Sequence, residues 1–142
     1  MKIVVVGGVA GGMSCAARAR RLAEDAEIVV IERDSFVSYA NCGLPYYLAG
    51  EITDRSALLL HTPRTLAASL ALDVRTGHEV LAIDRERRQV RVRELATGRE
   101  YDELYDTLVL STGAVPITPP VEGLDGETAR RVVRVLRSVP DV

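Results

Sequence analysis

Residues 2–12, KIVVVGGVAGG, decide the fold of this chain. The run of β-branched residues before Gly7 is typical of a strand that is buried on both faces. A turn with four glycines follows, and residues 13–25 after it are mostly good helix formers. Residues 27–32, EIVVIE, then form a second apolar strand. This order predicts a βαβ unit with parallel strands, and it fits the roughly 30-residue dinucleotide-binding fingerprint.

The glycine turn has the composition that a bound pyrophosphate requires. Small residues let the backbone amides at a helix N-terminus come close to phosphate groups. Gly7 and Gly12 hold the first and third glycine positions of the fingerprint, but Val9 stands at the middle one. Glu32, at the end of the second strand, suits a pair of ribose hydroxyls. The alternative is a tight turn without a ligand, but it does not explain why the strand, the turn, the helix and the acidic residue all match the fingerprint.

The rest of the chain completes an α/β fold. Residues 44–50 have the length of one or two helical turns, and Thr62 and Pro63 are suited to begin a second helix. That helix is predicted to extend to residue 72, and a third parallel strand is predicted at 78–84. Residues 89–95 and 100–104 form a predicted antiparallel hairpin with one solvent-exposed face. A buried strand within 105–114 then ends in small residues. We therefore predict a Rossmann-like parallel sheet with a small antiparallel insertion.

Composition narrows the class of protein. The chain has 142 residues, 47% hydrophobic residues and a net charge of −2, which suits one ordinary globular domain and gives no sign of nucleic-acid binding. No apolar run reaches the ~20 residues that span a bilayer. The glycines interrupt the apolar helix that a signal peptide needs. Two cysteines make no disulphide framework, so we expect a cytoplasmic protein, and we expect no membrane partner. His61 and His78 have no partners at metal-ligand spacing, so we expect no metal.

The segment SYANCGLPY, residues 38–46, holds the most informative thiol. Cys42 lies ten residues after Glu32, at the start of a predicted short helix. Serine, asparagine and two tyrosines around it make a poor apolar core, so a purely structural role fits badly. The thiolate is the reactive form, and a helix N-terminus favours it. Cys15, in contrast, shares a helical stripe with Ala19 and Leu22, the pattern of a core face.

A neighbouring stripe of the first helix carries polar side chains. Ser14, Arg18 and Arg21 stand at i, i+4 and i+7, which places a hydroxyl and two guanidinium groups on one face. Arginine suits phosphate because its fork donates two hydrogen bonds at once. A solvated arginine face explains the pattern equally well at this point.

Together, these motifs resemble a known family. The glycine turn, Glu32, the Asn-Cys segment and the strand YDTLVLSTGA (105–114) are similar in order and spacing to the N-terminal FAD part of the single-cysteine pyridine nucleotide-disulphide oxidoreductases. Within that family they most resemble the coenzyme A-disulphide reductases. The resemblance covers essentially the whole chain.

The residues at three positions distinguish between members of this family. The NADH peroxidases and water-forming oxidases of the family have a catalytic histidine where this chain has Ala10, and they usually carry serine where it has Asn41. Glutathione-reductase-like members need a second cysteine at the position of Tyr47. A lone thiol cannot form an intramolecular disulphide, so its oxidised form must be a mixed disulphide with a small thiol or a sulfenic acid. These positions favour a disulphide reductase with one redox cysteine.

The resemblance implies a set of site residues. Cys42 is the catalytic residue. The residues that bind FAD are Gly7, Gly8, Val9, Ala10, Gly11, Gly12, Glu32, Arg33, Val80, Ser111, Thr112 and Gly113, and those that bind coenzyme A are Ser14, Arg18, Arg21, Ser38 and Asn41.

It also implies an activity and a domain division. NAD(P)H would reduce FAD, electrons would pass to Cys42, and Cys42 would reduce a coenzyme A disulphide. Residues 1–115 would be the N-terminal part of the FAD-binding domain, and 116–142, which hold Pro116, Pro119 and Pro120, a linker and the start of the next segment.

Several alternatives stay open. Family members continue with a second dinucleotide fingerprint for NAD(P)H and a dimerisation domain, so we expect a homodimer for the full-length enzyme and no NAD(P)H site in these residues. The chain alone could be a nucleotide-binding module without turnover. NADH against NADPH, and a persulphide or polysulphide against coenzyme A disulphide, are not separated by the sequence.

Overall fold

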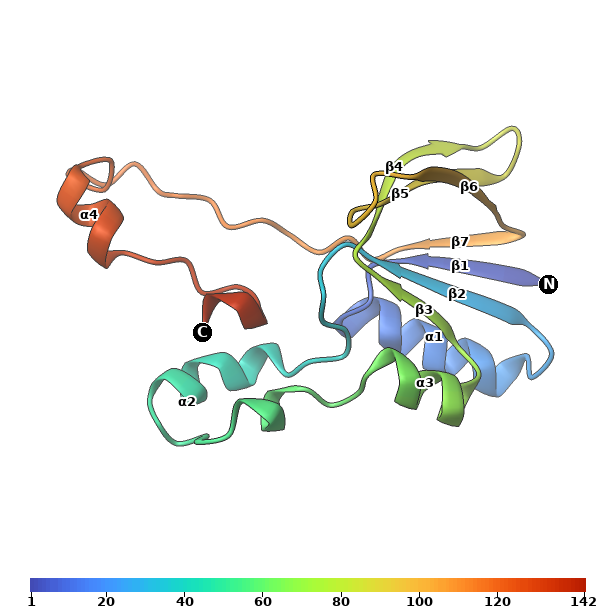
Figure 1. Ribbon diagram of the computed structural model, residues 1–142, viewed down its shortest axis with the longest axis horizontal. Helices are drawn as coiled ribbons and strands as arrows, with labels where there is room; N and C mark the ends of the chain where they lie inside the picture. The colour runs from blue at the N-terminus through green and yellow to red at the C-terminus, as the bar shows by residue number, and fades with distance from the viewer. The chain divides into compact units, whose positions relative to one another are not determined.

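The computed structural model describes residues 1–142 and divides them into two compact units (Figure 1). Unit 1 contains Met1–Tyr39 and Leu59–Thr112, and unit 2 contains Ala40–Leu58 and Gly113–Val142. No helix of either unit is long and apolar enough to cross a membrane.

Unit 1 is built on a four-stranded parallel sheet with the order β3-β2-β1-β7. Its strands are β1 (Lys2–Val6), β2 (Glu27–Glu32), β3 (Asp73–Thr76) and β7 (Thr107–Leu110). In the register of β1 with β2, Val6 stands beside Ile31, so the glycine turn begins next to the end of β2. The predicted βαβ unit is confirmed.

Two helices cover one face of this sheet, α1 (Ala10–Leu22) and α3 (Pro63–Leu70) (Figure 1). Alternate residues of the strands point to that face, because successive side chains of a strand point to opposite sides. Ile3, Val5, Ile28 and Val30 accordingly pack in one core cluster with Met13, Ala16, Ala26, Val37, Leu66 and Leu72.

A three-stranded antiparallel sheet covers the other face. Its strands are β4 (His78–Asp84), β5 (Gln89–Glu94) and β6 (Glu100–Leu104), paired in the order β4-β5-β6. The opposite set of alternate residues, Val4, Val29 and Ile31, packs there against Val90 and Val92. The predicted hairpin is therefore confirmed, and the two central parallel strands, β1 and β2, are buried on both faces.

The assignment of residues 78–84 as the third parallel strand is wrong. β3, residues 73–76, takes that place beside β2, and Gly77 with a φ of +69° separates it from β4, which pairs antiparallel with β5. A four-residue strand is too short to show a clear hydrophobic period, whereas β4 is longer. Only their pairing partners show which of β3 and β4 belongs to the parallel sheet, so the sequence pattern indicated the wrong strand.

Three smaller predictions also need correction. Helix α1 begins at Ala10 and ends at Leu22, because the end of the glycine turn is already helical. Leu22 is 70% exposed, so the predicted core stripe is wrong at this position, whereas Cys15 is half-buried and Ala19 packs against the core; the buried residues of the helix are Gly12, Met13 and Ala16. Strand β7 is an edge strand that is only partly buried, because nothing in the described chain pairs with its outer side.

Helix α3 follows its predicted start. The Thr62 side chain accepts a hydrogen bond from the Thr65 amide, and the Thr65 hydroxyl accepts one from the Thr62 amide, which is a capping box. Pro63 occupies the first helical position. The helix ends at Leu70, two residues earlier than predicted, because Ala71 adopts a left-handed conformation with a φ of +48°.

Unit 2 consists of short elements. The 3-10 helix η1 (Asn41–Gly43) leads into α2 (Leu44–Leu48), and η2 (Arg55–Leu58) follows. The later part contains α4 (Glu127–Val132) and η3 (Val139–Asp141). The helical turns predicted for 44–50 are confirmed, whereas the domain boundary after residue 115 stays a prediction.

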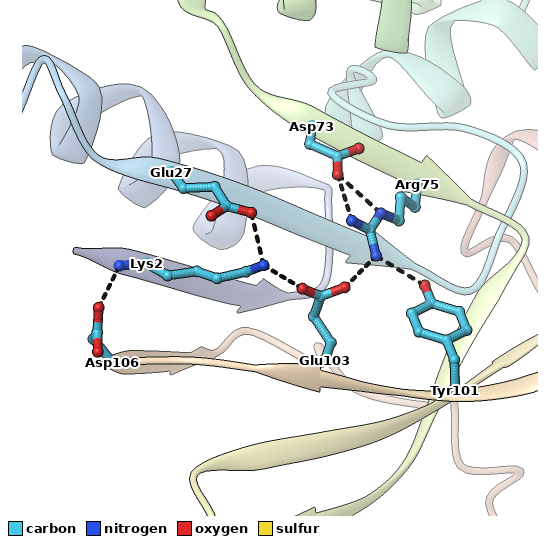
Figure 2. A network of polar contacts seen from close by, with 7 residues as sticks. All are labelled: Lys2, Glu27, Asp73, Arg75, Tyr101, Glu103 and Asp106. Carbon is cyan, nitrogen blue, oxygen red and sulfur yellow. Dashed lines mark hydrogen bonds and ion pairs between the residues drawn. The ribbon is translucent and has the colours of Figure 1, made fainter.

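A network of charged side chains joins the two sheets of unit 1 (Figure 2). Glu103 of β6 is only 8% exposed, and its Oε1 lies 2.5 Å from the Lys2 Nζ of β1. Its other oxygen accepts a hydrogen bond from Arg75 of β3. Lys2 also contacts Glu27, at 2.6 Å. One buried carboxylate thus bridges β6 to strands on both sides of β2.

These contacts change the protonation of the network. Burial by itself raises the pKa of the Glu103 carboxyl, but the bonds from Lys2 and Arg75 outweigh it and hold the pKa below its usual range. The bonds to Glu103 and Glu27 raise the pKa of Lys2. A lowered carboxyl pKa contributes stability above the pKa of the unfolded chain, and that stability is lost as the pH falls through the folded value.

We expect Glu103→Gln to lower the free energy of unfolding at pH 7 by about 1–3 kcal/mol, since bonds from charged donors are lost. This difference should begin to shrink near pH 4, the ordinary pKa of a glutamate in the unfolded chain, and it should vanish only when the pH falls below the lowered pKa of Glu103 in the folded protein. Urea unfolding across this pH range measures both effects. Asp102→Asn is the control: Asp102 forms an exposed ion pair with Arg91, so this change should lower the free energy of unfolding by less. If the difference in free energy of unfolding between wild type and Glu103→Gln were the same at every pH, the assignment would be contradicted.

Candidate functional site

The glycine turn of unit 1 places helix α1 close to the end of β1. Val9 is the N-cap residue, and the first intrahelical bond runs from the Met13 amide to the Val9 carbonyl at 3.1 Å. No side chain caps this helix, and its first turn has no acidic residue. The amides of the first turn are therefore open to an anion, as a phosphate-binding helix start requires.

Two glycines permit this close packing. A Cβ atom on Gly12 would lie 1.7 Å from the Gly7 carbonyl oxygen, and one on Gly7 would lie 2.1 Å from the Ser111 carbonyl oxygen. Gly7 also has a φ of +101°, which other residues rarely adopt. Gly11 is different, because a Cβ there would lie 3.4 Å from Ser111 Oγ, an ordinary contact.

Glu32 closes the turn from the side of β2. Its carboxylate is buried, with the residue 8% exposed. Oε2 accepts a hydrogen bond from the Gly8 amide at 2.6 Å, and Oε1 accepts one from the Asp34 amide at 2.9 Å. Each oxygen retains a second lone pair. Glu32 thus holds the turn in place, and it keeps acceptor capacity for a hydroxyl group.

Ser38 and Ser111 border the same turn. The Ser38 amide donates to the Gly8 carbonyl at 2.9 Å, and Ser38 has a φ of +48°. Ser111 follows β7, and its amide donates to the Val6 carbonyl at 2.8 Å. The structure therefore brings the glycine turn, Glu32, Ser38 and Ser111 together within unit 1.

The other predicted cofactor residues are more scattered. Arg33 follows Glu32 and is exposed, 3.9 Å from Glu79 Oε1. Val80 is half-buried in β4 and packs against the core between the two sheets. Thr112 ends unit 1, exposed, and Gly113 belongs to unit 2. These assignments stay predictions.

The arginines of α1 differ in what they contact. Ser14, Arg18 and Arg21 are all exposed on the helix, as the predicted stripe requires. Arg20, half-buried, instead donates from Nε to the Leu70 carbonyl at 2.8 Å and from Nη2 to the Ala71 carbonyl at 2.9 Å. Arg20 therefore ties α1 to the end of α3, while the two exposed guanidinium groups are free to meet a ligand from solvent.

The thiol segment lies in unit 2. Cys42 is a free, exposed cysteine in η1, directly before α2, and Asn41 beside it is half-buried. The Gly43 amide donates to the Ala40 carbonyl at 2.9 Å, and a Cβ on Gly43 would lie 2.7 Å from Leu58 Cδ2. The buried Leu58 thus holds this segment from behind, and the Cys42 thiol stays accessible for reaction.

Two features of the site went unpredicted. Val37 is buried, and its Cγ1 would be 2.8 Å from a Cβ on Gly8, so it supports the turn from a loop that shows no periodic pattern. The Glu103 network was also missed. Its signal was present, because Glu103 interrupts the hydrophobic alternation at an inward position of β6.

Comparisons with known proteins agree on one family. The family model described as pyridine nucleotide-disulphide oxidoreductase matches residues 1–142. A coenzyme A disulfide reductase of Staphylococcus epidermidis is 46% identical over 113 residues, 80% of this chain and 26% of that protein. The chain thus spans about a quarter of the length of this curated relative.

Solved structures give the same picture. The reduced CoADR-RHD protein of Bacillus anthracis is 49% identical with a TM-score of 0.82, over 87% of this chain and 22% of that one. An NAD-dependent persulfide reductase of A. fulgidus is 38% identical with a TM-score of 0.83, over 89% of this chain and 24% of that one.

The two glycines of the first helical turn offer a matched test of the packing. We expect Gly12→Ala to unfold or severely destabilise the protein, because its Cβ would meet a backbone oxygen at 1.7 Å. Gly11→Ala should be tolerated, with a change within about 1 kcal/mol, since it gains helix propensity and meets only ordinary contacts. Thermal unfolding followed by circular dichroism compares them, and equal losses of stability would refute the close approach at Gly12.

Proposed function

The chain belongs to the pyridine nucleotide-disulphide oxidoreductase family, and we propose that it is the FAD- and thiol-carrying part of an NAD(P)H-dependent coenzyme A disulphide reductase. Residues 1–115 are then the N-terminal part of the FAD-binding domain, and residues 116–142 are a linker and the start of the next segment. The activity belongs to the full-length protein, which we expect to be a homodimer.

One observation carries this proposal: an exposed thiol without a partner thiol. Cys42 is exposed and free, and Tyr47 stands where a resolving cysteine would be. The similarity to proteins named coenzyme A disulfide reductase supports the same reading. A single accessible thiol without a resolving cysteine is suited to exchange with a disulphide from outside the chain.

The residues of the glycine turn fit a dinucleotide such as FAD. The uncapped first turn of α1 offers amide donors for a pyrophosphate, and Gly11 leaves that side open. The Glu32 carboxylate, held by the Gly8 and Asp34 amides, retains lone pairs for ribose hydroxyls. FAD would supply the transfer of electrons from NAD(P)H to a thiol-bound disulphide.

The Cys42 thiolate acts as the nucleophile in this proposal. It attacks one sulfur of the coenzyme A disulphide, forms a mixed disulphide and releases the first coenzyme A as a thiolate, which takes up a proton. Two electrons and a second proton then release the second coenzyme A and restore the Cys42 thiolate. Each turnover thus converts one disulphide into two thiols. Asn41, beside the thiol, would orient the substrate.

The exposed stripe of α1 is suited to the phosphates of coenzyme A. Arg18 and Arg21 are exposed, and Ser14 adds a hydroxyl on the same face. Guanidinium groups bind phosphate through paired donors. Ser38, next to the glycine turn, completes the proposed set.

A persulphide is the second candidate substrate. The 38% identity to an NAD-dependent persulfide reductase favours it, and the thiol chemistry of Cys42 would be the same. An oxidase or peroxidase activity fits less well, because Ala10 offers no acid or base in the turn.

We expect Cys42→Ser to abolish reduction of coenzyme A disulphide by the full-length protein, because the hydroxyl does not form a mixed disulphide. Cys15→Ala should leave kcat almost unchanged, since Cys15 is half-buried on α1. NAD(P)H oxidation with coenzyme A disulphide measures both variants. Activity that survives in Cys42→Ser and disappears in Cys15→Ala would reverse the assignment.

Replacing Arg18 or Arg21 with alanine should raise KM for coenzyme A disulphide by roughly ten- to a hundredfold, because a hydrogen bond to a charged group is lost. The effect should shrink as salt rises, since exposed charges are screened over ~8–10 Å. A small disulphide without phosphates is the control substrate and should respond little. Equal changes with both substrates, or none, would remove the basis for coenzyme A binding.

A further inference from the structure

We propose that Arg75, held by Glu103, Asp73 and Tyr101, is a positioning residue for the dinucleotide site, acting on Glu32 and the glycine turn through the β3–β4 connection. The inference rests on the proposed function, because it assumes that the turn binds a dinucleotide. It adds that the charged network between the two sheets sets the affinity of that site, although none of its side chains belongs to the predicted binding set.

Arg75 is held more firmly than its neighbours on β3. Its Nε donates to Asp73 Oδ2 at 3.0 Å, and its Nη1 donates to the Tyr101 hydroxyl at 3.2 Å and also to Glu103 (Figure 2). The guanidinium carbon also lies 5.7 Å from the centre of the Tyr101 ring. All five donors of a guanidinium point in fixed directions, so such a set of partners defines its position.

The location of Arg75 makes this anchoring important. β3 is an edge strand that pairs only with β2, so backbone bonds hold it on one side alone. Arg75 supplies a second attachment, across the face of the sheet to β6. In the register with β2, Arg75 stands beside Ile31, and the next residue, Thr76, stands beside Glu32.

A continuous series of hydrogen bonds leads from this strand to the turn. Two residues after Arg75, the Gly77 amide donates to the Asp34 carbonyl at 3.2 Å. The Asp34 amide donates to Glu32 Oε1 at 2.9 Å, and Glu32 Oε2 accepts from the Gly8 amide at 2.6 Å. A shift of the end of β3 therefore moves the loop that holds one oxygen of Glu32, and Glu32 in turn holds Gly8.

The connection after β3 is tied down at other points as well. The Leu95 amide donates to the Gly77 carbonyl at 2.8 Å, and His78 Nδ1 lies 2.8 Å from the Thr76 carbonyl oxygen. The His78 ring stands edge-on to Tyr101, with centroids 6.0 Å apart. Tyr101 thus contacts both Arg75 and the start of β4, so the network and the connection form one packed group. Residues that support binding groups in this way tune their affinity.

Arg75→Met tests this proposal, and in that variant Glu103 keeps its bond to Lys2. The full-length apoprotein is titrated with FAD and, separately, with ADP by isothermal titration calorimetry, while circular dichroism reports folding. Arg91→Met is the matched control: Arg91 pairs with Asp102 at 2.7 Å on the same sheet, with a half-exposed side chain. Arg75→Lys keeps the charge but loses the fork.

We expect Arg75→Met to weaken FAD and ADP binding by roughly three- to thirtyfold at a temperature where the variant stays folded. The affinity of Arg75→Lys should lie between those of Arg75→Met and wild type. Arg91→Met should bind both ligands as wild type does. If Arg75→Met does not fold, the affinities of Arg75→Lys and Arg91→Met for FAD and ADP are compared instead, and weaker binding by Arg75→Lys alone is the expected result. A lower Tm with unchanged affinities, or equal weakening in Arg91→Met, overturns the inference. If wild type binds neither FAD nor ADP, the proposed function itself fails.

Discussion

The close approach of helix α1 to the end of strand β1 is the constraint on which the rest of the structure depends. A side chain at Gly12 would meet the Gly7 carbonyl at 1.7 Å, and one at Gly7 would meet Ser111 at 2.1 Å. Because neither position carries a side chain, the first turn of α1 reaches the point where β1 and β7 end. The amides of that turn then face outward without a capping side chain, which is the arrangement that an anion needs.

Around this contact, the two buried carboxylates of unit 1, Glu32 and Glu103, both have structural partners, and one of them also has a proposed role in binding. Glu32 is the clearest case: its two oxygens hold Gly8 and Asp34, and the same carboxylate is the proposed ribose acceptor. Glu103 has only structural partners, yet through Arg75 it reaches the connection that supports Asp34. Buried charge in this protein therefore defines geometry, which a fully apolar interface between the sheets would leave less specified.

The segment around Cys42 differs from the glycine turn in its exposure. Its elements are short, and its reactive residue is exposed, whereas the apolar Leu58 behind it is fully buried. A nucleophile that exchanges with a disulphide from solvent needs access, and a buried support keeps it from moving out of place. The proposed nucleotide-binding turn thus belongs to unit 1, and the proposed nucleophile belongs to unit 2.

Local sequence was enough to predict the βαβ unit, the helix start at Thr62 and Pro63, the hairpin of β5 with β6 and the exposed thiol of Cys42, because each depends on neighbouring residues. Three outcomes became visible only in the folded chain: β3 rather than β4 joins the parallel sheet, Met13 and Ala16 rather than Leu22 face the core, and Glu103 is bound by Lys2 and Arg75. Those outcomes depend on pairing and packing between residues far apart in the chain, and a local pattern of hydrophobic residues carries no information about the partner that each strand, helix face or charge will find.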